Sequence, residues 1–145
     1  TLGALDRREE EIAVYDDLIA RFGTETEFAL QEQVGKALLK KGVALGNLDR
    51  GEEEVAVYDD LIARFGAVIE LSLREMVAEA YLYKAITLGD LHRHEEEIAV
   101  YDDLMTRFTT AIDSPLREQI ATAFLNQRGQ TVRAPPSHRG NRRLR

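Results

Sequence analysis

The sequence predicts an all-α protein, a stacked array of about six helices, from two observations. One 22-residue block occurs three times, starting at Leu2, Leu45 and Leu88. The first two blocks differ at three positions, and the third differs from the first at six. Apolar residues also recur at steps of three, four and seven, both inside and between the blocks. A fixed period of roughly 20–50 residues is typical of stacked repeats, in which each unit buries its apolar face against its neighbours.

Each block predicts one amphipathic helix, which we call a block helix. Its apolar residues follow helical spacing, and the alternation expected of a strand is absent. Three glutamates open each block, where acids offset the positive end of the helix dipole. Gly23 and Gly66 close the first two blocks and predict left-handed caps. The predicted ranges are 9–22, 52–65 and 95–108, and the first stripe is Ile12, Tyr15, Leu18, Ile19 and Phe22.

Between the blocks, a second apolar pattern predicts what we call the spacer helices. Leu30, Val34, Ala37 and Leu38 are spaced by three and four, and the pattern repeats 43 residues later. The spacer helices are predicted over 29–46 and 72–89. A third begins at Ser114 and Pro115, a capping residue followed by proline at the first helical position, and continues to about residue 127.

The two patterns together resemble the tetratricopeptide-repeat (TPR) family over residues 1 to about 127. Small and aromatic residues fall where that family places them on its helix pairs, and EEEVAVYDDLI is similar to its second-helix motif. The resemblance implies a right-handed α-solenoid of antiparallel helix hairpins, a TPR-like superhelix. The matching positions are Leu38 and Tyr81, Gly42 and Ala85, Leu45 and Leu88, and Tyr58 and Tyr101.

The chain departs from the family in repeat length and at its C-terminal end. Nine additional residues per repeat fall between a block helix and the next spacer helix, and Gly23, Gly66 and Thr109 replace a terminal proline. After the third spacer the apolar period stops and arginine and proline follow. We therefore expect a repeat array over residues 1–129 and a basic, non-repeat tail over 130–145.

Composition excludes several classes of function. The net charge is −7, and because all 26 acids but only 14 of the 19 Lys and Arg precede residue 131, the array itself carries −12. Such an acidic surface repels phosphate backbones and anionic lipid, which argues against a nucleic-acid partner. There is no cysteine, which excludes disulfide frameworks and thiolate chemistry. No apolar run approaches the roughly 20 residues of a membrane span, so we expect no membrane partner. Cytoplasmic location is the default expectation; the missing initiator Met leaves an upstream segment open.

No catalytic, cofactor or metal site is predicted. The acidic runs have a structural interpretation, because Asp17 and Arg21 form an acid-first (i, i+4) pair that recurs in every block. His92 and His94 are placed in a solvated turn and lack the spacing of metal ligands. No nucleophile or phosphate-loop motif is present, which leaves an acid–base enzyme unmotivated and not excluded.

The contrast between the two helix types carries the functional prediction. The block helices are nearly identical, whereas residues 24–44 match 67–87 at only seven of 21 positions. The TPR resemblance implies that the spacer helices line a groove that binds a peptide or a partner helix; drift on a solvated face would also produce the variation. The implied groove residues are Lys36, Leu39, Lys40, Val43, Asn47, Glu79, Leu82, Tyr83, Ile86, Asp90, Leu125 and Asn126.

The leading hypothesis is therefore a non-catalytic protein-interaction scaffold without cofactors. The alternative is a self-associating structural module whose exposed repeat ends join chains head to tail. In that case, Ile12, Tyr15 and Ile19 of the first helix would meet Leu116, Ile120 and Phe124 of the last helix of another copy. The basic tail has two open interpretations, an arm that binds an acidic partner or nucleic acid, or a non-functional end of the array.

Overall fold

The computed structural model describes residues 2–108 and 114–132 and is helical throughout these ranges apart from short connections. No strand occurs among the described residues. The helices are α1 (Leu2–Phe22), α2 (Phe28–Asn47), α3 (Gly51–Phe65), α4 (Leu71–Asp90), α5 (His94–Phe108) and α6 (Ser114–Val132). The all-α prediction with six helices is confirmed for this part of the chain.

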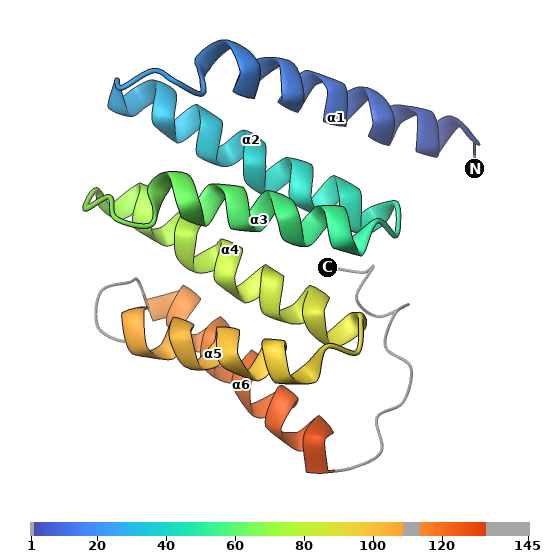
Figure 1. The fold of residues 1–145 in the computed structure, drawn as a ribbon, viewed down its shortest axis with the longest axis vertical. Helices are drawn as coiled ribbons and strands as arrows, with labels where there is room; N and C mark the ends of the chain where they lie inside the picture. The colour runs from blue at the N-terminus through green and yellow to red at the C-terminus, as the bar shows by residue number, and fades with distance from the viewer. Residues whose placement is uncertain (1, 109–113, 133–145) are drawn as a thin grey trace.

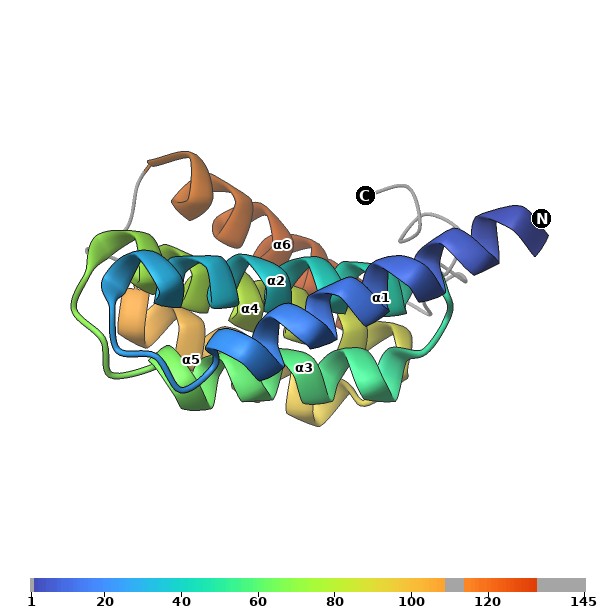
Figure 2. The ribbon, with the colours of Figure 1, turned by 90° about the horizontal axis from the view of Figure 1, so that it is seen from above.

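Consecutive helices pack on each other and form a row from α1 to α6 (Figure 1). The spacer helices α2, α4 and α6 also contact one another in that order, whereas no such close packing joins the block helices α1 and α3. Figure 2 shows α3 and α5 on one side of the molecule and α6 on the other, with α2 and α4 between them. None of the described helices is both long and apolar enough to cross a bilayer.

Four of the six predicted helices begin and end within one residue of their predicted bounds. Their apolar stripes form a common core, in which Tyr58, Leu61, Leu73 and Leu104 are fully buried. The last helix extends to Val132, so the helical array passes the predicted boundary at residue 129. The rest of the predicted tail lies outside the described residues.

The first block helix was wrongly predicted to start at residue 9, since α1 begins at Leu2. In the later copies, the equivalent residues end a spacer helix and form a turn, in which Asp49 and His92 take left-handed φ values of 63° and 61°. That conformation is costly for residues other than glycine and persists where packing supports it. Among the described residues no spacer helix packs on that side of α1 to hold the turn, and the equivalent Asp6 is helical.

Gly23 and Gly66 do end their helices, but the predicted left-handed caps are wrong. No glycine among the described residues has positive φ, and Gly66 has right-handed helical angles. A Cβ at either position would lie 2.5 Å from the carbonyl oxygen four residues earlier. Glycine is therefore favoured here because the backbone turns tightly over its own helix end.

The outer face of α1 is the clearest difference between copies of the block helix. Val14 is 63% exposed and Phe22 is 37% exposed, whereas the equivalent residues of α3, Val57 and Phe65, are 8% and 5% exposed. The prediction that Ile12 would also be uncovered is wrong, because α2 packs on that side and Ile12 is 7% exposed. At the other end, Ile120 of α6 is buried too, so less of α6 is open than predicted.

Candidate functional site: two surfaces

The spacer-helix surface contains the twelve predicted groove residues, which lie on α2, α4 and α6 as expected. Lys36 and Lys40 on α2 are exposed, and so are Leu125 and Asn126 on α6. Leu125 is the most exposed apolar member, at 69%. These four residues form the part of the predicted surface that is openly accessible to a partner.

Most of the other members are partly covered. Leu39, Tyr83 and Ile86 are half-buried and pack against the core. Val43, Asn47, Glu79 and Asp90 are also half-buried. The predicted apolar strip is therefore a row of partly covered side chains edged by exposed charges, and not an open channel.

Leu82 corrects the predicted surface, because it is only 3% exposed and belongs to the core. The equivalent Leu39 on α2 is half-buried. The physical reason is that α4 packs between two spacer helices, α2 and α6, whereas α2 has a spacer neighbour only on its α4 side. A charged substitution at Leu82 would therefore disrupt packing and cannot report on binding.

The carboxyl group of Glu79 lies on this surface in a partly desolvated position. Burial raises its pKa, and the nearby charge of Glu75 raises it further, whereas a hydrogen bond with Tyr83 lowers it. Glu79 therefore holds its negative charge at a cost in folding free energy. An exposed cation of a partner placed beside Glu79 would offset that cost.

Glu79→Gln should make stability less sensitive to pH. Because the folded-state pKa is raised, the folded protein binds this proton more readily than the unfolded chain does, so the free energy of unfolding should rise as pH falls from neutral through that pKa. The glutamine side chain does not titrate, so this variant should be more stable than wild type at pH 7. The advantage should disappear near the pKa of the glutamate carboxyl group in the unfolded chain, about 4.3. Urea unfolding across this range measures the difference, and a constant difference would contradict the assignment.

The second surface is a furrow between the block helices α1 and α3, with α2 beneath it. Its volume is about 450 Å³. Leu38 and Leu45 contribute apolar side chains from α2, and acids stand on both block helices. We call this the first furrow, and its lining residues are Asp16, Ile19, Ala20, Leu38, Lys41, Leu45, Glu53, Ala56, Val57 and Asp60.

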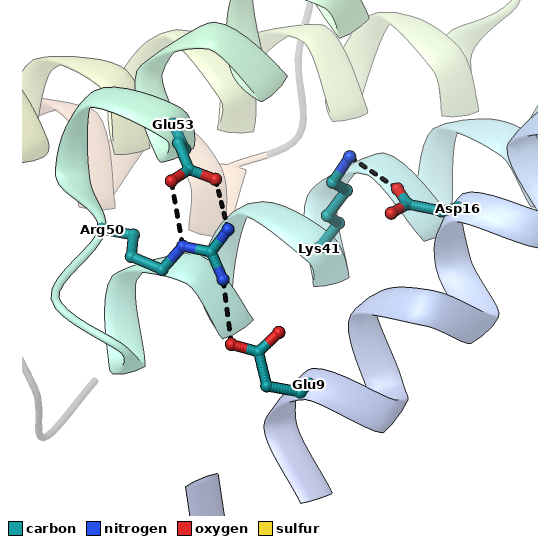
Figure 3. A network of polar contacts seen from close by, with 5 residues as sticks. All are labelled: Glu9, Asp16, Lys41, Arg50 and Glu53. Atoms are coloured by element: carbon teal, nitrogen blue, oxygen red, sulfur yellow. Dashed lines mark hydrogen bonds and ion pairs between the residues drawn. The ribbon is translucent and has the colours of Figure 1, made fainter. Parts of the chain in front are cut away.

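Ion pairs bridge the helices around the first furrow (Figure 3). Lys41 Nζ lies 2.6 Å from Asp16 Oδ1, which ties α2 to α1. In the turn before α3, Arg50 donates from Nε to Glu53 at 3.0 Å and from Nη1 to Glu9 of α1 at 3.0 Å. Exposed pairs of this kind contribute roughly 0–1 kcal/mol each, so their main effect is to fix how one repeat sits on the next.

The same bridges recur one repeat later. Lys84 lies 2.6 Å from Asp59, and Arg93 donates to Glu96 and, at 2.8 Å, to Glu52. Sequence reasoning assigned the glutamates only to the helix dipole and missed these contacts. The sequence does contain a signal for these contacts. Arginine occupies the same block position in all three copies, as Arg7, Arg50 and Arg93, whereas the residue after it differs in each copy.

Several other acidic residues of the block helices make contacts within their own helix. The predicted (i, i+4) pairs of aspartate and arginine are present in all three copies, at 3.0, 3.1 and 3.7 Å. Glu54 is fully buried and accepts a hydrogen bond of 2.6 Å from Tyr58. His92 lies in the predicted turn, but His94 begins α5 and lies 3.1 Å from Glu97. Within residues 2–108 and 114–132, no group of three or more His, Asp or Glu could hold a metal ion.

Comparison with known proteins adds no relationship. No protein-family model matches the chain, and neither a curated protein nor a solved structure matches it. The two surfaces therefore rest on the geometry of this chain alone.

Proposed function

We propose that this protein is a non-catalytic interaction scaffold that holds a peptide or a helix of a partner protein on its spacer-helix surface. In this proposal, the six helices form a right-handed α-solenoid of antiparallel hairpins similar to those of the TPR family. Every spacer helix then contributes side chains to the same face, which is the face of the array that a partner would meet.

The observation that carries the proposal is where α2 and α4 differ. At positions where the two helices are identical, the side chains are buried, partly buried or ion-paired, as for Val34, Ala37 and Lys41. At the two exposed positions of α2 the chemistry changes, from Lys36 to the half-buried Glu79 and from Lys40 to the half-buried Tyr83. Some buried positions differ as well, as Leu38 and Tyr81 do. Residues of both signs beside half-buried apolar groups suit an amphipathic segment.

A peptide selection with two surface variants tests this function. Peptides would be selected from a random displayed library against the whole protein, and their dissociation constants measured by calorimetry. The combined variant Lys40→Glu and Tyr83→Ala should weaken the selected peptides by about tenfold or more, since it removes an accessible cation and an aromatic contact. Unchanged affinity would overturn the proposal.

Asp17→Asn provides the matched control, because Asp17 is exposed on the block-helix side. It should leave peptide affinity unchanged. Light scattering across protein concentration would measure the alternative function, in which copies join through their ends. Association without any peptide binding would favour that alternative.

A further inference from the structure

The residues that line the first furrow have sequence counterparts one repeat later, on α4 and the helices beside it. We call this set of residues the second furrow, and its members lie 43 positions after those of the first. Nine of the ten positions carry the same residue type, and the exception is Leu38, which is replaced by Tyr81. The second furrow is formed by Asp59, Ile62, Ala63, Tyr81, Lys84, Leu88, Glu96, Ala99, Val100 and Asp103.

Tyr81, on α4, packs against the end of α5. Its ring is 5.9 Å from that of Phe108, and the guanidinium group of Arg107 stands 5.8 Å from the ring centre. Only 6% of Tyr81 is exposed. Burial raises its pKa, and charges on both bordering block helices act on it, with Arg107 lowering and Asp59 raising the pKa. Four charged side chains therefore lie near enough to Tyr81 to act on it: Asp59, Lys84, Asp103 and Arg107.

The protein thus carries a buried aromatic side chain in one repeat at the position where the other repeat has Leu38 beside a cavity. The first furrow presents the same acids, the same lysine and the same alanine and valine walls. Its Leu38 is 2% exposed and carries no polar tip. A phenol ring that entered from solvent would contact apolar walls. Its hydroxyl group would lie near hydrogen-bonding side chains of both positive and negative charge.

We propose that the first furrow is a binding site for a tyrosine side chain presented by an extended segment of a partner protein. The site is separate from the spacer-helix surface and does not depend on the function proposed for it. The aromatic ring packs over Leu38 and Leu45, and the hydroxyl group hydrogen-bonds within the border formed by Asp16, Lys41 and Asp60.

N-acetyltyrosinamide is a suitable probe, with N-acetylalaninamide as the control for backbone contacts. Titration into the whole isotope-labelled protein, followed by methyl NMR, should shift the signals of Ile19, Leu45 and Val57 in a saturable way. The signals of Ile62, Leu88 and Val100, which line the second furrow, should not move. Absence of saturable shifts at the first furrow would overturn the proposal, as would equal shifts with the alanine control.

Two reciprocal variants sharpen the test. Leu38→Tyr copies the second furrow into the first and should abolish the shifts. Tyr81→Leu copies the first into the second and should create a second set of shifts at Ile62 and Val100. If Leu38→Tyr is folded by circular dichroism and still binds the probe with unchanged affinity, the proposal fails.

Ala56→Phe serves if either reciprocal variant fails to fold, because Ala56 is an exposed wall residue of the first furrow. This substitution should block the entrance of the furrow and so weaken the affinity for the probe by about tenfold or more. Ala99→Phe is the matched control, because Ala99 is the equivalent exposed residue of α5. Equal effects of the two substitutions would contradict binding at the first furrow.

Discussion

Tyr58→Ala should lower the free energy of unfolding by roughly 3–5 kcal/mol, the range for truncation of a large buried aromatic residue. Tyr58 is 0% exposed, and its ring lies so close to Gly42 that no Cβ fits there without movement. Its hydroxyl also donates to the buried carboxylate of Glu54 at 2.6 Å. The variant therefore creates a cavity and removes a hydrogen-bond donor from a buried carboxyl group, and urea unfolding measures both effects together.

Tyr15→Ala is the matched variant in α1, because Tyr15 occupies the same block position and is only partly buried. It should cost about 1–2 kcal/mol, since a neighbouring spacer helix is present on one side only. Tyr58→Phe separates the hydrogen bond from the packing and should cost about 1–3 kcal/mol. Equal losses for Tyr15→Ala and Tyr58→Ala would contradict the stacked packing.

A copy of residues 24–43 placed before Thr1 should raise the free energy of unfolding by about 2–4 kcal/mol. The addition restores the 43-residue register, so that the copied Gly42 would face Tyr15 and Gly3 would face Glu11. Val14 and Phe22 should then become as buried as Val57 and Phe65, which are 8% and 5% exposed. Chemical unfolding measures the gain.

The control for this extension carries leucine in place of the copied Gly42. That side chain would collide with Tyr15 as any Cβ at Gly42 would collide with Tyr58, so it should remove most of the gain. The last helix of another copy lacks both small residues, because Arg128 and Val132 stand at the positions of Gly42 and Gly46. Head-to-tail joining should therefore be weaker than the engineered contact. An equal gain from both extensions would contradict this account.

The parts of the fold that sequence predicted are those set by local periodicity. The block and spacer helices α2 to α5 follow from apolar spacing, and their bounds agree within one residue. Burial of Tyr58 and Tyr101 follows from the same stripe. The (i, i+4) pairs also needed only helix geometry, because residues four apart lie on one face.

The parts that sequence did not predict depend on which helix lies next to which. Asp6 and Asp49 share a block position, yet one is helical and the other has φ of 63°. Leu39 and Leu82 share a spacer position, yet only Leu82 is fully covered, because α4 has spacer neighbours on two sides. The contact between Arg50 and Glu9 likewise spans two repeats. Two residues at the same repeat position can therefore have different neighbours, and the sequence repeat does not show which neighbours each one has.

The central claim is that the spacer-helix surface binds a partner segment, and NMR mapping of one selected peptide tests it most directly. The account predicts that backbone signals around Lys36, Lys40 and Tyr83 shift on titration, while those around Asp17 and Asp103 on the block helices do not. Shifts confined to the block helices, with none on α2 or α4, would contradict the account.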